Sequence, residues 1–221
     1  MNLIESIIQT VQKGGLVMYP MILLGIIVFA LIIERWLYLS KVIRGSHDFK
    51  KTFFSHWSAG RVQEAGECAR THDGPIAKMM SKGIANLSRT KEDVKESIHE
   101  EAIAEIPRLE RFLSAIATIG TMMPIMGLLG TVTGMISTFD VITVKGTGDP
   151  KALASGISEA LITTETGLIF ALPILLLHSI LSSKVDNFTA EMERATTSFL
   201  TQIPSGAENH YRKNNDEDGG R

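Results

Sequence analysis

Two carboxylic acids lie inside a stretch that is otherwise almost free of charge. Residues 152–183 contain no ionisable side chain except those of Glu159, Glu165 and His178. A carboxyl group within a membrane-spanning helix is costly unless it faces a cavity or a partner, so such residues mark candidate ion or proton pathways. A carboxyl group held away from water is also suited to take up and release a proton. For Glu159, near the start of the stretch, the alternative is a side chain that reaches to the membrane interface.

Hydroxyl side chains accompany Glu159 along one face of the expected helix. At about 100° per residue, Glu159, Thr163 and Thr166 fall on nearly one line. Thr164 is turned from Glu159 by about 140°, and Glu165 by about 120° in the other direction. The spacing therefore predicts a polar stripe that contains Thr163, with Glu165 in a different environment.

Small and hydroxyl residues also share one face of the preceding apolar stretch. Gly127, Thr131, Gly134 and Thr138 follow i, i+4, i+7, i+11 spacing. The glycines predict close packing against a neighbouring helix, since small residues let membrane helices approach each other. The hydroxyl group of Thr131 has two possible roles: it bonds its own backbone, or it contacts a passing ion or water molecule.

The sequence lacks the residue patterns of an enzyme or a metal site. Segment 127–134 is rich in glycine but has no phosphate-binding lysine, and His99 has no second histidine at zinc-binding spacing. His178 is a lone histidine near a helix end, which is typical of an interfacial side chain. Cys68 is the single cysteine, which excludes an intramolecular disulfide, and we expect it to be buried and unreactive. We therefore expect no catalytic residues, no metal and no cofactor.

Three long apolar stretches must position these side chains. A helix needs about 20 apolar residues to cross a bilayer, and each stretch is long enough. The first is longer than a signal-peptide core and lacks a small-residue cleavage site, so we interpret it as a retained span. The sequence predicts an all-α integral membrane protein with transmembrane helices at 14–39, 111–142 and 153–183.

The segment 40–110 between the first two spans is charged, and its pattern is helical throughout. Asp73-Gly74-Pro75 is typical of a turn, with Pro75 at the first position of the next helix. Thr90 followed by Asp93 resembles a capping box, with Asp in place of the usual Glu or Gln. Glu105, in the run from Glu100 to Arg108, is expected on a solvated face or in salt bridges between subunits.

From Lys91 the helical pattern continues into the second span without a strong break. We therefore expect one long rod, which Pro107 and Pro124 bend rather than end. The remaining segments are expected to be a periplasmic amphipathic segment, an external loop, a cytoplasmic helix and a disordered tail. These segments are 1–13, 143–152, 184–208 and 209–221.

Basic residues indicate how the chain crosses the membrane. They are dense in residues 41–111, whereas the loop between the second and third spans has only Lys145 and Lys151. The positive-inside rule places the first segment in the cytoplasm, with the N-terminus outside and the C-terminus inside. Acidic residues balance the basic ones in the cytoplasmic part, so nucleic acid is not an expected partner.

Four motifs resemble the ExbB branch of the MotA/TolQ/ExbB proton-channel family, over roughly residues 10–205. Two of them open and close the first span, and one lies in each of the other two spans. The motifs are GLVMYP (15–20), IERWLY (33–38), PIMGLLGTVTG (124–134) and GISEALITT (156–164).

The resemblance implies a homopentamer in the bacterial inner membrane. The pentamer would enclose the helices of an ExbD- or TolR-like partner, whose transmembrane aspartate takes up and releases protons to power a TonB- or TolA-like protein. Thr131, Glu159 and Thr164 match the family's functional membrane residues. Thr163 lies nearer the glutamate on the helical wheel, and Glu165 departs from the family pattern and could add a second protonatable site.

Two other functions are compatible with the same residues. Threonine hydroxyls and a carboxylate also suit sodium, a hard cation. A non-conducting scaffold that holds a partner protein in the lipid bilayer would need none of these side chains. An enzyme is the least expected reading of the sequence.

Overall fold

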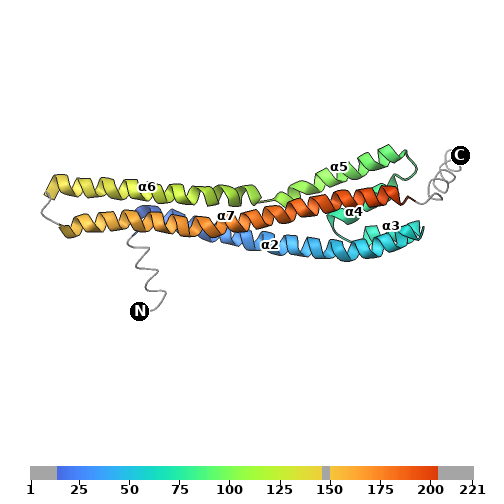
Figure 1. Ribbon diagram of the computed structural model, residues 1–221, viewed down its shortest axis with the longest axis horizontal. Helices are drawn as coiled ribbons and strands as arrows, with labels where there is room; N and C mark the ends of the chain where they lie inside the picture. The colour runs from blue at the N-terminus through green and yellow to red at the C-terminus, as the bar shows by residue number, and fades with distance from the viewer. Residues whose placement is uncertain (1–13, 146–149, 204–221) are drawn as a thin grey trace. The chain divides into compact units, whose positions relative to one another are not determined.

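The computed structural model describes residues 14–145 and 150–203, and every regular element in these ranges is an α-helix (Figure 1). This confirms the predicted all-α class. The predicted segments 1–13 and 209–221 lie outside the described residues. The helices are α2 (Gly15–Ser58), α3 (Val62–Thr71), α4 (Pro75–Ala85), α5 (Lys91–Glu110), α6 (Leu113–Lys145) and α7 (Pro150–Thr201).

Three helical segments are long and apolar enough to cross a membrane, as the sequence predicted. They are Gly15–Ser58, Lys91–Thr143 and Ala154–Thr201. Large apolar side chains on them point away from the protein, including Leu16, which is 85% exposed, and Leu172, which is 71% exposed. Apolar surface of this extent requires lipid or partner helices to cover it. The chain is therefore a multi-pass membrane protein.

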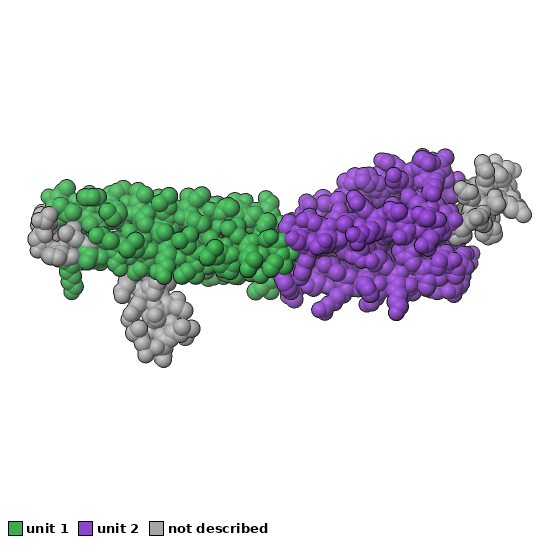
Figure 2. Space-filling view, in the orientation of Figure 1, with its two compact units in different colours: residues 1–35, 112–181 green, residues 36–111, 182–221 purple. Residues whose placement is uncertain are grey.

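The chain divides into two compact units, which Figure 2 shows in different colours. The first, here named the membrane unit, holds the described residues of 1–35 and 112–181. It contains the start of α2, all of α6 and the first part of α7. The second, here named the bundle unit, holds the described residues of 36–111 and 182–221. It contains α3, α4 and α5 with the remaining parts of α2 and α7.

Aromatic side chains form much of the core of the bundle unit. Trp57 and Phe199, from α2 and α7, stack with ring centroids 4.3 Å apart. The indole Nε1 of Trp57 also donates a hydrogen bond of 3.2 Å to the backbone oxygen of Phe199. Phe53 stacks on both rings, and all three side chains are fully buried. This cluster joins two helices that are far apart in the sequence.

Local signals set two helix starts as predicted. Thr90 and Asp93 form a reciprocal capping box, in which the Asp93 amide donates to Thr90 Oγ1 over 3.2 Å and the Thr90 amide donates to Asp93 Oδ2 over 3.3 Å. α4 begins at Pro75 after the N-cap residue Gly74. Proline suits this position because its missing amide hydrogen would lack a helical partner in any case.

The expectation of one continuous helix from Lys91 into the second span is wrong. α5 ends at Glu110 and α6 begins at Leu113, with Phe112 at a φ of +66°. A bulky residue rarely adopts this left-handed conformation, which ends the run of helical backbone. The Arg35 guanidinium lies 5.4 Å from the centroid of the Phe112 ring, a cation–π contact within the membrane unit. Pro107 and Pro124 lie inside their helices, as expected.

The helix bounds differ from those of two predicted segments. α6 runs through Lys145 and α7 begins at Pro150, so the connection is shorter than the predicted loop 143–152. α7 then continues for 52 residues to Thr201, so the predicted cytoplasmic helix 184–208 is the second part of the same helix as the third span. Its last residues, from 204 onward, lie outside the described residues.

Glu105 is neither on a solvated face nor available to a neighbouring subunit. Its side chain is buried and accepts hydrogen bonds from Lys78 Nζ at 2.9 Å and from an Arg108 guanidinium nitrogen at 3.0 Å. Both cations belong to the same chain and the same unit. Burial of a carboxylate is tolerated here because it is paired, whereas Glu100 remains exposed.

Cys68 lies partly buried on α3, and burial raises the pKa of its thiol. A raised pKa leaves less thiolate at neutral pH, and the thiolate is the reactive form. We expect iodoacetamide to modify Cys68 more slowly than the same thiol in the unfolded chain, with a rate profile displaced to higher pH. Alkylation followed by mass spectrometry from pH 7 to 10 tests this expectation. Equal rates for the folded and unfolded chain would contradict it.

Candidate functional site

The polar stripe predicted on α7 faces α2 within the membrane unit. Phe170 lies one turn beyond Thr166 on the same face of α7, with its ring centroid 6.4 Å from that of Phe29 on α2. A Cβ atom added to Gly25 of α2 would lie 2.9 Å from Phe170 Cε1, so the absence of a side chain at Gly25 lets the two helices approach. The stripe is therefore an internal contact surface along this part of α7.

Glu159 and Thr163 meet the N-terminal end of α2. The Thr163 hydroxyl group, which is fully buried, lies 2.7 Å from the Gly14 backbone oxygen and 2.9 Å from the Glu159 backbone oxygen. A Cβ atom at Gly15 would overlap the Glu159 carboxylate, and Gly15 adopts a φ of +69°, which favours glycine. A helix N-terminus carries partial positive charge, so it is a favourable place for an acidic side chain.

The opposite contact of α7 is with the glycine face of α6. The Thr164 hydroxyl group donates a hydrogen bond of 2.8 Å to the backbone oxygen of Gly127. A Cβ atom at Gly127 would lie 3.0 Å from the Thr164 Cα atom, and one at Gly134 would lie 3.0 Å from the Ala160 Cβ atom. A Cβ atom at Gly130 would overlap the Thr163 side chain. These contacts confirm that the glycines serve close helix packing.

This packing predicts opposite effects for two glycine substitutions. Gly127→Ala forces the rigid α7 backbone away, so we expect it to lower the stability of the folded protein by about 1–3 kcal/mol. At Gly45, in the interior of α2, an added Cβ atom has open space around it. Gly45→Ala should therefore stabilise by about 0.5–1 kcal/mol, because glycine is unfavourable inside a helix. Thermal melting of both variants in detergent, followed by circular dichroism, measures the difference.

A matching loss of stability in Gly127→Ala and Gly45→Ala would contradict this account of the α6–α7 contact. The two substitutions add the same methyl group inside a helix. Their effects differ only through what that methyl group meets.

Thr131 lies half-buried on α6. Its hydroxyl group donates to the Leu128 backbone oxygen on the same helix, at 2.6 Å. This is the first of the two roles that the sequence left open for Thr131. The hydroxyl oxygen keeps a lone pair with which it can accept a hydrogen bond.

Glu165 lies apart from the other polar residues of α7. It is exposed on an outward face that it shares with Leu161, which is 63% exposed, and Leu168, which is 49% exposed. A carboxyl group on this face requires an aqueous passage or a partner helix. The structure thus brings Glu159 and Thr163 together, turns Thr164 toward α6 and leaves Glu165 outside both contacts.

Sequence reasoning did not predict the part that Gly14 and Gly15 play in this site. The sequence feature that could have indicated this role is a glycine pair beside the first apolar residue of a membrane helix. Glycine has no side chain, so another helix can approach closely there.

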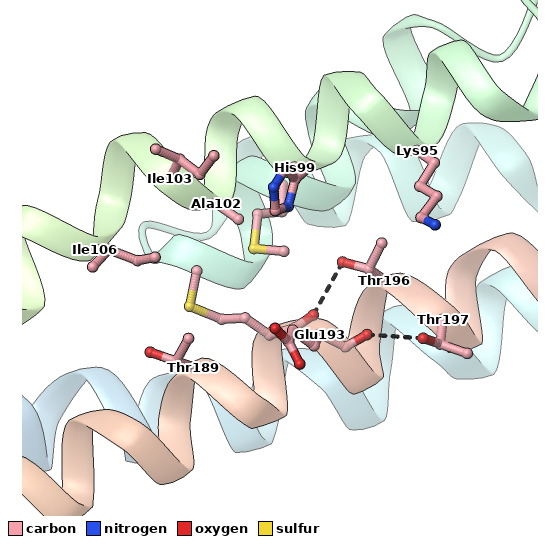
Figure 3. A pocket seen from close by; sticks show the side chains of 11 residues that line it. Lys95, His99, Ala102, Ile103, Ile106, Thr189, Glu193, Thr196 and Thr197 are labelled. Carbon is pink, nitrogen blue, oxygen red and sulfur yellow. Dashed lines mark hydrogen bonds between the residues drawn. The ribbon is translucent and has the colours of Figure 1, made fainter.

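The bundle unit contains a separate cavity of about 350 Å³ between α5 and α7 (Figure 3). Lys95 and His99 project into it from α5, and Glu193 projects from α7. Ile103 and Ile106 supply apolar lining at the other end. Within the ranges 14–145 and 150–203, no cluster of three or more His, Cys, Asp or Glu side chains could hold a metal ion.

Three apolar spans, with Glu159, Thr163 and Thr164 at the contacts between them, define a helical multi-pass membrane protein. The chain belongs to the MotA/TolQ/ExbB proton channel family, whose sequence pattern matches residues 71–194. This match covers the second span, most of the third and much of the bundle unit. The motifs at 124–134 and 156–164 lie within the matched residues, and the predicted resemblance to this family is confirmed.

Individual relatives extend the similarity over most of the chain. A protein of Methanothermobacter thermautotrophicus described as a biopolymer transport ExbB homolog is 28% identical over 193 residues, 87% of this chain and 68% of that protein. The Tol-Pal system protein TolQ of Haemophilus influenzae is 26% identical over 212 residues, 91% of this chain and 93% of TolQ. The biopolymer transport protein ExbB of Salmonella typhimurium is 30% identical over 133 residues, 54% of each chain.

Proposed function

We propose that this chain is the pentameric inner-membrane subunit of a motor driven by the proton-motive force. It conducts protons together with an ExbD- or TolR-like single-span partner and transmits energy to envelope processes such as TonB-dependent transport. A TonB- or TolA-like protein receives the force. Membership of a proton channel family and similarity to both ExbB and TolQ support this function. No covalent chemistry is required of the chain.

The observation that carries the proposal is the presence of two carboxyl groups on one membrane-spanning helix. Glu159 lies half-buried at the N-terminal end of α2, and Glu165 lies exposed on the outward face of α7. A helix that merely anchored the chain in lipid would gain nothing from either group, because each is expensive in hydrocarbon. Proton movement past α7 gives both groups a role.

The proposed ion pathway contains Thr131, Glu159, Thr164 and Glu165, with Thr163 as a positioning residue. The Thr163 hydroxyl group is fully buried and occupied by two backbone oxygens. It therefore acts through Glu159, whose backbone it holds against the start of α2. Thr131 and Thr164 are half-buried, so neighbouring subunits or the partner helix can reach them.

Protons that move inward pass the partner's transmembrane aspartate beside these groups. Neutralisation of that aspartate removes its charge from the low-dielectric interior, which lowers the cost of moving the partner helix past the apolar side chains of the surrounding subunits. Repeated protonation and release would move the partner within the pentamer. The N-terminus is periplasmic and the C-terminus cytoplasmic, in accord with the distribution of basic residues.

Co-purification with the partner tests this proposal. The chain and a single-span partner with a transmembrane aspartate are expressed together, extracted in detergent and analysed by native mass spectrometry. The expected result is five copies of this chain with the partner bound. A monomer, or an oligomer that never retains the partner, would overturn the proposal.

Two alternatives make different predictions for the same complex. If the motor is coupled to sodium, activity follows the sodium gradient and is insensitive to the pH gradient. If the chain is a scaffold, partner function survives the loss of every polar side chain in the third span. The family description as a proton channel favours the proton-driven motor over both.

A further inference from the structure

One face of α5 concentrates negative charge on the surface of the bundle unit. Glu92, Glu96 and Glu100 are spaced four residues apart, so they lie along one side of the helix, and all three are exposed. Like charges at this spacing destabilise a helix. Ile103 lies on the same side and is 53% exposed. An apolar side chain beside a row of acids is an arrangement that a basic, partly apolar partner surface would stabilise.

A groove of about 770 Å³ between α2 and α7 has the complementary character. Lys51 and Arg194 line it and are exposed, and Lys50 lines it while paired with Glu191. Further lining comes from Phe54, Ala190, Ala195, His47, Asn187 and Ser198. The groove therefore offers basic groups around a floor with apolar parts.

The acidic face and the basic groove lie on different sides of the bundle unit. The α5–α7 cavity marks the side of α7 on which α5 lies, and it is lined on α7 by residues such as Glu193 and Thr196. The α2–α7 groove is lined on α7 by residues such as Arg194 and Ser198. At 100° per residue, these two sets are centred roughly 160° apart around α7. A contact between two unlike surfaces on opposite sides of a subunit is head-to-tail, and such contacts generate a ring when the rotation between copies closes.

The two surfaces also lie at the same level along the bundle. Figure 3 shows Lys95 of α5 near Thr197 of α7, and Ile106 near the end of the cavity where Thr189 lies. The acidic face from Glu92 to Ile103 and the groove from residue 187 to 198 each extend over about 17 Å of helix. Copies in one membrane are related by rotation about its normal, which keeps every residue at the same depth.

From these observations we infer that the acidic face of α5 docks into the α2–α7 groove of an adjacent copy of this chain. Glu96 and Glu100 face Lys51 and Arg194 of the adjacent copy, and Ile103 covers the apolar floor. The inference rests on the proposed ring of subunits and names the surfaces that join it outside the membrane. Exposed ion pairs weaken with salt, so this contact should loosen as ionic strength rises.

Cysteine cross-linking between differently marked copies tests the contact. One copy carries Glu96→Cys and the other Lys51→Cys, both in a Cys68→Ser background, and they are co-expressed in membranes. A short bis-maleimide reagent should link them into a covalent dimer, severalfold more than it links either copy expressed alone. As a matched control, Arg70→Cys replaces Lys51→Cys, because Arg70 is also basic and exposed but lies on α3. Equal linkage in the control would overturn the inference.

Charge exchange provides a second, independent measurement. Glu96→Lys with Glu100→Lys should increase dissociation of the solubilised oligomer in low salt. Addition of Lys51→Glu and Arg194→Glu to this variant should restore the stability of the oligomer, whereas addition of Arg70→Glu should not. If the oligomer persists while neither cross-linking nor charge exchange has any effect, the docking surfaces are wrong and the proposed function stands. If no oligomer exists in membranes, both fall.

Discussion

Glu159→Gln lowers partner-dependent proton flux by about 100-fold or more, which is the contribution that a positioned proton-transfer group usually makes. Glutamine keeps the size of the side chain and fits beside Gly15, but it cannot take up or release a proton in the relevant range. The measurement is the rate of internal pH change in proteoliposomes that contain the chain and its partner. The oligomer should assemble normally, since the contacts of Thr163 are with the backbone of residue 159.

The control for this variant is Glu193→Gln, which removes an exposed carboxyl group from the bundle unit. Its flux should equal that of the wild type. Thr131→Ala tests the part of the proposed pathway that lies on α6, and its proton flux is measured in parallel with that of Glu159→Ala. Unchanged flux in both of these variants would show that the pathway residues are wrongly assigned.

Trp57→Ala lowers the free energy of unfolding by about 3–5 kcal/mol, the usual cost of removing a large buried aromatic side chain. Trp57 is fully buried, stacks on Phe199 at 4.3 Å and donates a hydrogen bond to its backbone. The substitution leaves a cavity and an unpaired backbone oxygen at the contact between α2 and α7. Loss of circular dichroism with temperature in detergent measures the effect.

The matched control is Trp36→Ala, in the same unit. Trp36 is 39% exposed, and the Lys184 ammonium group lies 3.4 Å from its ring centroid. An exposed cation–π pair contributes only about 0.5–1 kcal/mol, so Trp36→Ala should lower the melting temperature much less. Equal destabilisation by the two substitutions would contradict the assignment of the aromatic cluster as the core of the bundle unit.

Features that depend on local chemistry could be predicted from the sequence. The three spans follow from the length of uncharged stretches, and the start of α5 follows from the Thr90–Asp93 capping box. The packing role of Gly127 and Gly134 follows from their spacing on one helix face. Each of these features needs only residues that are neighbours in the chain or on one helix.

Features that depend on contacts between distant segments could not be predicted in this way. Glu105 is buried because Lys78, on another helix, reaches it, and the local charge pattern around Glu105 resembles a solvated face. Phe112 ends the helical run at a left-handed φ, beside Arg35 from the first span. Helix propensity does not predict the break at Phe112, because tertiary contacts override propensity.

The two candidate threonines of α7 lie in contacts with different helices. The helical wheel placed Thr163 on the Glu159 face, and the structure places its hydroxyl group 2.9 Å from the Glu159 backbone oxygen. The family motif selected Thr164, which bonds Gly127 on α6 instead. The two residues therefore serve different neighbouring helices. The proposed pathway assigns proton passage to Thr164 and a positioning role to Thr163.

The most direct test of proton conduction is the flux through the wild-type chain, reconstituted with and without its single-span partner. The account predicts that vesicles with both proteins conduct protons along an imposed pH gradient in the absence of sodium, and that the chain alone conducts far less. Flux that needs sodium, or that is equally absent with and without the partner, would contradict the central claim of a proton-driven motor subunit.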